Sequence, residues 1–365
     1  MKWFEYGNEK ISHREILVAI PSMVIAVGIL SQPRDLAAAT VGSDGWILLV
    51  VSGGIIVFIT WLMARLASKF PRQSFLTYSS KIVTKPVAVV MTFIFIAIAI
   101  ALAALEVRAI SDIAKQYLFD RTPVEIISLS FLLVVVYAVS GSRAGIFRLN
   151  LMFLPIILFI AIAVFVFNIG WFSLDNLLPV FETSFTGLGK GLPTGLLSFM
   201  GFGIILFYTS LVENPAKVPR SAVIGMCIPV LLYILIFITS IGVFGNAVTS
   251  DLIFPTIELA KEVDIPGGFF ERFESIFFVI WIMAIFNTTV MAIDVALLAL
   301  SSIFKNKSKM KHVCILSPLV YVIAMYPEDL LDVSALGGYL SYFAISYTSI
   351  VTILLSVIAK VRKVK

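Results

Sequence analysis

Charged residues are scarce in this sequence: Asp, Glu, Lys and Arg make up 13% of its 365 residues, whereas hydrophobic residues make up 60%. A water-soluble domain carries about 25% charged residues because its surface faces water, so this composition excludes an ordinary soluble protein. The charges cluster between apolar runs of about 20 residues, the length that a helix needs to cross a bilayer. The short alternating segments of a membrane β-barrel are missing. The sequence therefore predicts an all-α polytopic membrane protein.

Cysteine and histidine are nearly absent, with two residues of each. Cys227 and Cys314 fall at the edges of apolar runs, where small apolar packing residues are common, and neither a disulfide nor a metal site is expected. His13 and His312 also lie at such edges, so there is no intramembrane His ligand set. The segment 187–191, Gly-Leu-Gly-Lys-Gly, lacks the spacing of a phosphate-binding loop. We expect no enzyme, no metal, no cofactor and no nucleic-acid partner.

Ten apolar segments suggest transmembrane helices, and we expect residues 1–365 to form a single transmembrane domain. Helices 1–5 occupy about 14–170 and helices 6–10 about 191–361. Residues 1–15 are polar, and no small-residue cleavage site follows the first apolar run, so we expect the N-terminus to be retained. The expected spans lie near 14–41, 45–67, 86–118, 123–140, 146–170, 191–212, 219–245, 271–304, 311–326 and 336–361.

The distribution of Lys and Arg predicts the orientation of these spans. Most of the 27 basic residues lie in segments that share one side of the membrane when the spans alternate. Acidic residues concentrate in the connections of the other side, mostly between Asp175 and Asp332. Only an even number of spans gives this alternation. We therefore expect ten spans with both termini in the cytoplasm.

Two of the expected spans are interrupted by residues that disfavour a helix. Span 1 contains Gly-Ile-Leu-Ser-Gln-Pro at 28–33, and span 6 contains Ser-Phe-Met-Gly-Phe-Gly at 198–203. Pro33 cannot donate to the helical ladder and disfavours helix at Gln32, so we expect a break near 28–33. Interrupted helices at corresponding places of two inverted halves indicate a binding site near the midplane. For Gly201 and Gly203, close helix packing is the alternative interpretation.

A helix broken inside the membrane also exposes backbone groups. The half-helix that starts near Pro33 would direct free N–H groups inward, which suits a carboxylate. Free carbonyls at either break would suit an ammonium group or a cation.

Polar side chains at depth are further candidates. Span 8 carries Asn287, Thr288 and Asp294, and Asn287 and Asp294 share one helix face because they are seven positions apart. Span 3 carries Glu106 and Arg108 near its end. An ionisable residue inside a membrane usually faces a cavity or a partner, so these residues are either functional or part of structural ion pairs.

The connection before span 8 mixes aromatic and acidic residues, at 254–258 and 266–274. It predicts a segment folded back over the outer mouth, with an interfacial aromatic belt as the alternative.

Several short motifs in this order resemble the GerAB-type spore germination proteins, over nearly the whole chain. These motifs are Gly-Ile-Leu-Ser-Gln-Pro-Arg at 28–34, Asp-Gly-Trp at 44–46, Glu-Val-Arg-Ala at 106–109, Arg-Thr-Pro at 121–123, Phe-Pro-Thr at 254–256, Glu-Arg-Phe-Glu-Ser at 271–275 with Trp281, and Tyr-Pro at 326–327.

That family comprises the B subunits of nutrient germinant receptors, within the amino acid–polyamine–organocation superfamily. The resemblance implies a LeuT-like fold of five plus five inverted-repeat helices, with interrupted helices 1 and 6, in the inner membrane of a spore. It also implies two partners, a membrane-anchored A subunit and a lipoprotein C subunit, and a small nutrient ligand. Carried over by position, the ligand-binding residues are Gly28, Ile29, Ser31, Gln32, Pro33, Glu106, Ser198, Gly201, Gly203, Asn287 and Thr288.

Three functions fit these features. The first is a receptor subunit that senses an amino acid or a similar small nutrient. The second is a secondary amino acid transporter coupled to Na⁺ or H⁺, and the third is a scaffold for the A subunit. Span 6 near Gly203 offers no charged side chain, so a ligand amine there would rely on backbone carbonyls, or the ligand is uncharged.

Overall fold

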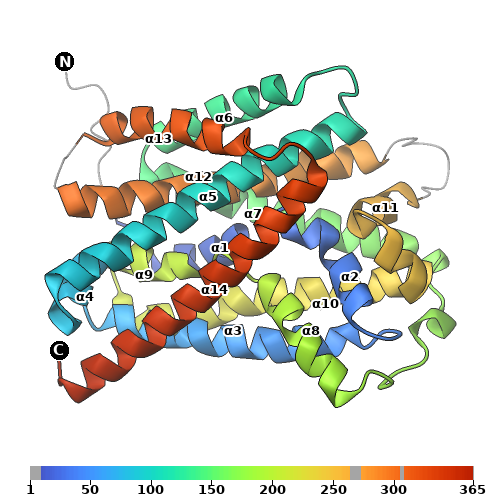
Figure 1. Ribbon diagram of the computed structural model, residues 1–365, viewed down its shortest axis with the longest axis horizontal. Helices are drawn as coiled ribbons and strands as arrows, with labels where there is room; N and C mark the ends of the chain where they lie inside the picture. The colour runs from blue at the N-terminus through green and yellow to red at the C-terminus, as the bar shows by residue number, and fades with distance from the viewer. Residues whose placement is uncertain (1–9, 264–272, 305–307, 365) are drawn as a thin grey trace.

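The computed structural model describes residues 10–263, 273–304 and 308–364, and these residues are almost entirely helical (Figure 1). The α-helices are α1 (His13–Val24), α2 (Gly28–Ala39), α3 (Gly45–Ser68), α4 (Phe75–Ile82), α5 (Lys85–Tyr117), α6 (Val124–Ser140), α7 (Arg143–Phe167), α8 (Phe185–Leu197), α9 (Ile205–Tyr208), α10 (Val218–Asp251), α11 (Pro255–Lys261), α12 (Phe273–Phe304), α13 (Lys309–Ala324) and α14 (Leu330–Val361). Short 3₁₀ turns join some of them: η1 (Asn168–Gly170), η2 (Leu174–Leu177), η3 (Phe202–Ile204), η4 (Thr209–Leu211) and η5 (Pro215–Lys217).

Six helices in the described residues, α3, α5, α7, α10, α12 and α14, are long and apolar enough to cross a membrane. Two bent pairs raise the number to eight: α1 with α2, bent by 59°, and α8 with the 202–211 segment, bent by 54°. These pairs stand first and sixth in chain order, as expected. Helices α6 and α13 fill the fourth and ninth places with 17 and 16 residues. Seventeen residues extend about 26 Å, less than the roughly 30 Å hydrocarbon core, so the count of ten spans stays a prediction.

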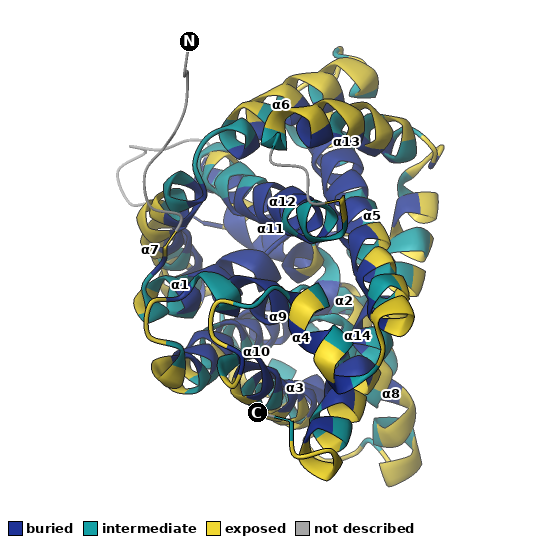
Figure 2. Ribbon diagram, turned by 90° about the vertical axis from the view of Figure 1, so that its left-hand side faces the viewer, coloured by how far each residue is buried: buried dark blue, intermediate teal, exposed yellow. Residues whose placement is uncertain are grey.

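The burial pattern is that of a membrane protein with a packed centre. Figure 2 shows buried ribbon along α1, α9, α10 and α12, and exposed ribbon on the outer helices α6, α7 and α13. The exposed positions include large apolar side chains such as Phe58, Val90, Leu133 and Phe159. In water such faces would be costly, whereas lipid tails solvate them. The chain is therefore a multi-pass membrane protein.

The described residues begin, before α1, and end, after α14, at one end of the bundle, on the left of Figure 1, which we call the terminal end. A short parallel bridge joins Ile11 to Val212 there: Ile11 N donates to the Leu211 carbonyl at 3.0 Å, and Glu213 N donates to the Ile11 carbonyl at 3.0 Å. Arg362, just past α14, donates to the Ile82 carbonyl at 3.0 Å. That this end faces the cytoplasm stays a prediction.

The Asp-Gly-Trp motif lies at the other end of the bundle, which we call the opposite end, and its contacts there explain its residues. The buried Asp44 carboxylate accepts hydrogen bonds from Phe181 N at 2.6 Å and Thr183 N at 2.7 Å, which fixes the loop before α8. Gly45 is needed because a Cβ there would collide with the Phe237 ring. Trp46 packs edge-on against Phe181, with ring centroids 6.1 Å apart.

Arg108 also has a structural partner at this end. Its Nε donates to Asp112 at 2.8 Å, and its terminal nitrogens donate to the carbonyls of Pro327 and Glu328. It thereby ties α5 to the connection between α13 and α14, which contains the Tyr-Pro motif. The structure places Arg108 in a tether between helices.

Candidate functional site

The first broken helix bends at residues 25–27, and not at 28–33 as the sequence predicts. Gly28 begins α2, and Pro33 lies inside this helix. Proline removes the N–H that would bond the carbonyl four residues earlier, which is that of Ile29. Thr256, on α11, donates its hydroxyl to this carbonyl at 2.9 Å, so the helix passes through Pro33 intact. The expected 28–33 break is therefore wrong by a few residues, because a distant side chain replaces the missing donor.

α11 lies in the connection before span 8, and that it covers the outer mouth stays a prediction. It packs against α2, α10 and α12 at the opposite end. Of the predicted segment 266–274, residues 266–272 lie outside the described residues, and Phe273 and Glu274 begin α12.

The second break meets the first. Between α8 and η3, Gly201 has φ +109°, a conformation that strongly favours glycine. A Cβ on Gly201 would lie 3.0 Å from the Met23 carbonyl oxygen, so the backbones of the two broken helices are in close contact. A Cβ on Gly203 would instead lie 3.2 Å from Thr348 on α14. Gly201 thus serves close packing between the two breaks, whereas Gly203 lies on another side.

Glu106 lies at the first break. Its carboxylate is buried and accepts a hydrogen bond from Val27 N at 3.4 Å, immediately before α2. No other hydrogen bond and no cation partner of this carboxylate exists within the described residues. The positive N-terminal end of α2, where the sequence suggested a ligand carboxylate, thus already faces the carboxylate of Glu106.

The carbonyl end of α1 is bonded by two side chains. Thr288 on α12 donates its hydroxyl to the Ser22 carbonyl at 3.1 Å, with the Met23 carbonyl at 3.4 Å. Tyr233 on α10 donates to the Val24 carbonyl at 2.7 Å and stacks on Phe199, with ring centroids 5.3 Å apart. Sequence reasoning missed Tyr233, although a tyrosine in the middle of an apolar span is a signal for such a role.

Four side chains around these elements are buried with polar atoms that have no hydrogen-bond partner in the described structure. They are Ser22 (Oγ), Gln32 (both amide atoms), Trp281 (Nε1) and Asn287 (Nδ2). Buried polar groups are almost always paired, because an unpaired one costs roughly 1–3 kcal/mol. Gln32 and Asn287 were predicted as site residues, whereas Ser22 was not. The break region therefore has hydrogen-bonding capacity that the protein itself does not use.

One face of α2 is open. Gly28, Asp35 and Ala38 are exposed and Ser31 is half-buried, a spacing that places them on one side of the helix. A Cβ on Gly28 would meet no atom within 4 Å. The exposed faces of the outer helices carry large apolar side chains, whereas this face of α2 is small and polar. Gly28, the first residue of this face, follows Val27, whose N–H donates to Glu106.

Three other residues predicted for the site, two on α2 and one just after α8, do not lie on this open face. Ile29 and Pro33 are buried, and Ile29 belongs to the main hydrophobic cluster. Ser198 donates its hydroxyl to the Thr194 carbonyl of its own helix at 3.4 Å. Only some of the predicted residues therefore lie on the open face of α2.

A cavity of about 50 Å³ lies on the terminal side of Glu106. Its wall is almost wholly apolar and includes Met23, Ala99, Leu102, Gly203 and Thr348. Leu102 precedes Glu106 by one helical turn, about 6 Å along α5. The space suits a few carbon atoms, since a water needs about 10–15 Å³ by the same measure.

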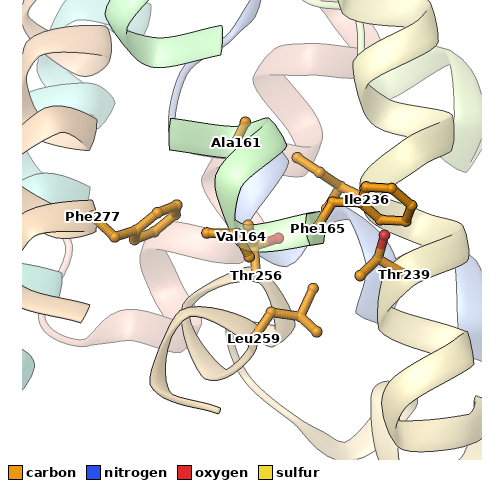
Figure 3. Close-up of a pocket in the computed structure, with 8 residues that line it drawn as sticks. All are labelled: Ala161, Val164, Phe165, Ile236, Thr239, Thr256, Leu259 and Phe277. Atoms are coloured by element: carbon orange, nitrogen blue, oxygen red, sulfur yellow. The ribbon is translucent and has the colours of Figure 1, made fainter. Parts of the chain in front are cut away.

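Two other hollows are less suited to a buried ligand. Figure 3 shows a cavity of about 10 Å³ between α7, α10, α11 and α12, in which Thr256 and Thr239 lie near apolar side chains. Thr239 donates to its own helix at Leu235, so this space is no more than a water site. A hollow of about 380 Å³ at the opposite end is open and rests on Arg108 and Glu328 of the tether described above.

Asp294 is fully paired. Its buried carboxylate receives Arg143 Nε at 3.1 and 3.2 Å and the Tyr208 hydroxyl at 3.1 Å, and Lys309 Nζ lies 3.8 Å away. Lys309 also donates to the Gly141 carbonyl at 2.8 Å. We call Asp294, Arg143, Tyr208 and Lys309 the ion cluster. It joins α7, α9, α12 and α13 near the terminal end.

Comparisons with known proteins agree with this architecture. The sequence profile of a family described as spore germination protein matches residues 10–333. The chain is 41% identical to spore germination protein GerLB of Bacillus cereus, over 100% of this chain and 98% of that one. It is 31% identical to spore germination protein YndE of Bacillus subtilis (strain 168), over 98% of both chains.

Solved transporter structures share the fold at low identity. MhsT, in complex with L-phenylalanine, matches with a TM-score of 0.76 and 14% identity over 95% of this chain and 89% of that one. Mhp1, a nucleobase-cation-symport-1 family transporter, matches with a TM-score of 0.68 and 13% identity over 90% of this chain and 75% of that one. The expected LeuT-like fold is confirmed.

Proposed function

Because the chain belongs to the spore germination protein family, we propose that it is the B subunit of a nutrient germinant receptor. In this role it binds a small, amino acid-like nutrient between its two broken helices and triggers germination together with an A subunit and a lipoprotein C subunit. Its place is the inner membrane of the spore, with both termini in the cytoplasm. The family profile and relatives of 41% and 31% identity support the germination role.

The ligand assignment rests on one observation: the buried carboxylate of Glu106 has no cation partner in the described structure. A buried carboxylate is costly unless it is paired and well hydrogen-bonded. Glu106 has one long hydrogen bond, from Val27 N at 3.4 Å, and lies at the inner end of the open face of α2. A ligand ammonium group that reaches this carboxylate would supply the missing cation.

The apolar cavity beside this carboxylate suits the side chain of the same ligand. It begins one helical turn from Glu106, at Leu102, and suits a few carbon atoms. An amino acid with a small or branched aliphatic side chain would place its ammonium group at Glu106 and its side chain beside Gly203. That MhsT, a protein of the same fold, was solved with L-phenylalanine supports this ligand class.

The unpaired groups of Gln32, Asn287 and Ser22 would complete such a site. An amino acid carboxylate needs hydrogen-bond donors, and the amide nitrogens of Gln32 and Asn287 are buried without an acceptor in the described structure. Occupation by a zwitterion, directly or through water, would satisfy these groups.

The test is direct binding by the purified full chain. A panel of the common amino acids is scanned for a rise in melting temperature, and each amino acid that gives one is titrated by calorimetry. Ala99→Leu fills the apolar cavity and is expected to weaken binding about tenfold or more. Val90→Leu, on the exposed face of the same helix, is the control and should bind normally. A panel without a binder, together with unchanged germination of spores that lack the gene, would refute the proposal.

The alternative is an ion-coupled secondary amino acid transporter, which the transporter fold also suits. Liposomes that contain the purified chain separate the two functions. A transporter accumulates labelled amino acid inside the vesicles, whereas a receptor subunit binds it without flux. A pure scaffold would instead keep its germination response when Gly201 is replaced by leucine.

A further inference from the structure

Eight basic side chains lie together at one corner of the terminal end, and we call them the basic corner. They belong to the end of α3 and the segment after it, to α4, to the start of α5 and to the end of α14, and all are exposed: Arg65, Lys69, Arg72, Lys81, Lys85, Lys360, Arg362 and Lys363. α14 packs against both α3 and α4, and Figure 1 shows α4 and the end of α14 at the same side of the bundle. Arg362 donates to the carbonyls of Ile82 at 3.0 Å and Val83 at 3.3 Å. The four helices therefore present one continuous basic surface.

This surface lacks acidic residues. The sequence has no Asp or Glu at 45–105 or at 333–365, the ranges from which all eight bases come. Within the described residues, none of the eight forms an ion pair. The bases of the ion cluster, at the same end, instead share the carboxylate of Asp294. Because like charges repel each other, the basic corner carries an uncompensated positive charge that attracts anions.

The basic corner begins where the lipid-facing surface ends. On α3, the exposed Phe58 is followed by Trp61, and the Arg65 guanidinium lies over the Trp61 ring, 5.0 Å from its centroid. Tryptophan concentrates at the membrane–water interface, so this contact indicates that Arg65 lies at the level of the lipid headgroups. On α5, Lys85 comes just before exposed apolar side chains such as Val90. Both helices thus change from apolar to basic at this end, as expected at the depth of the lipid phosphates.

We propose that the basic corner binds the phosphate groups of anionic phospholipids such as phosphatidylglycerol. Clusters of about four to eight Lys and Arg beside membrane-spanning helices are typical of surfaces that recognise anionic lipids. Because Arg362 of the α14 end is bonded to the Ile82 carbonyl, it lies next to Lys81 of α4, and one lipid phosphate would be shared by both. This surface is separate from the site between the two broken helices, and the inference does not rest on the proposed function.

Another part of the terminal end provides a matched comparison. Its exposed bases alternate along the chain with Glu15 and Glu213, and they are Lys10, Arg14, Lys217 and Arg220. A general excess of basic residues on one side of the membrane, which orients the spans, would attract anionic lipid to both parts alike. We expect the attraction at the basic corner alone, because only there are the charges of one sign.

The experiment measures the lipid selectivity of the purified full chain. The protein is reconstituted in phosphatidylcholine bilayers, and electron paramagnetic resonance compares how strongly spin-labelled phosphatidylglycerol and spin-labelled phosphatidylcholine associate with it. At low salt we expect the anionic lipid to associate about threefold more strongly or better, and this preference should fall below about 1.5-fold in about 1 M salt. Equal association of the two lipids at low salt would overturn the proposal.

Two combined variants locate the surface. The corner variant carries Lys69→Gln, Lys81→Gln, Lys85→Gln and Lys363→Gln. The control variant removes the same charge from the mixed part of this end, with Lys10→Gln, Arg14→Gln, Lys217→Gln and Arg220→Gln. All these side chains are exposed, so both variants should fold, with melting temperatures in phosphatidylcholine within about 1 °C of the original chain. The corner variant should lose at least about half of the lipid preference and the control should keep it, whereas an equal loss in both would overturn the proposal.

Inorganic phosphate separates a lipid surface from a site for a soluble anion. At millimolar concentration and constant ionic strength it should leave the lipid preference unchanged, because the bilayer presents its own phosphates at the depth of the basic corner. A preference that disappears in phosphate would contradict lipid as the occupant. No amino acid takes part in these measurements, so a failed ligand panel would refute the proposed function and leave their outcomes as they are.

Discussion

Helix α12 carries two buried polar regions that differ in how completely they are paired. At its middle, Asn287 has an amide nitrogen without an acceptor in the described structure, beside the bonded Thr288. About 10 Å further along, Asp294 is surrounded by donors from three other helices. A fully paired buried network fixes one arrangement, whereas unpaired groups keep capacity for a ligand or water. The two regions of α12 therefore differ in unused hydrogen-bonding capacity: the ion cluster has its carboxylate paired, whereas the region at Asn287 has a buried donor without an acceptor in the described structure.

The largest effect is expected where pairing is complete. Asp294→Ala leaves the Arg143 guanidinium buried without its carboxylate, which typically costs about 3–5 kcal/mol. The purified variant should show a strongly lowered melting temperature and a low yield. Asp251→Ala, an exposed carboxylate at the end of α10, is the control and should change the stability by less than about 0.5 kcal/mol. If both variants lowered the stability by the same small amount, the ion cluster would contribute no more to stability than an exposed carboxylate does.

At the break, we expect the reverse pattern: little change in folding and a large change in binding. Glu106→Gln removes a carboxylate that has a single hydrogen bond of 3.4 Å, so the melting temperature should hardly fall. Amino acid binding should weaken about 10–100-fold, since a hydrogen bond to a charged group contributes about 1.5–3 kcal/mol. Calorimetry on both proteins measures this. A variant that binds normally but unfolds early would place Glu106 with the ion cluster.

The smallest effects come from two glycines that the sequence presents as equivalents. Gly201→Ala forces a side chain into φ +109° and against Met23, at a cost of about 1–3 kcal/mol. Gly28→Ala meets open space in the first turn of α2 and should leave the stability unchanged or raise it by up to about 1 kcal/mol. Melting temperatures of the two variants give the comparison directly. Equal destabilisation would mean that the face of α2 at Gly28 is not open.

Much of this architecture follows from patterns within the chain. Apolar runs predict the helices, and the Gly- and Pro-containing motifs inside two of these runs predict the interruptions of the first and sixth spans. The sequence also predicts Glu106 as a polar residue within a span. The exact bend does not follow, because Pro33 remains helical only through Thr256, which is 223 positions away in the chain. The role of Asp294 depends in the same way on Arg143 and Tyr208. Local propensity marks a weak point in a helix, but the partner that compensates for it is a property of the tertiary fold.

The Asp-Gly-Trp motif is a second case in which partners distant in the sequence decide the role of a residue. Its resemblance to a family was visible in the sequence, but its physical reason was not. Asp44 receives backbone donors from residues 181 and 183, and Gly45 gives room to Phe237. Each residue of the motif thus serves a contact with a segment more than 130 positions away, which no periodicity within 44–46 could indicate.

The short bridge between Ile11 and Val212 has a mechanical consequence. Residue 11 directly precedes α1 and residue 212 directly follows η4, so the bridge clamps together the ends of both interrupted helices. Two hydrogen bonds of 3.0 Å across this clamp resist sliding of one segment past the other. A displacement of either segment end therefore strains the two hydrogen bonds that tie it to the other.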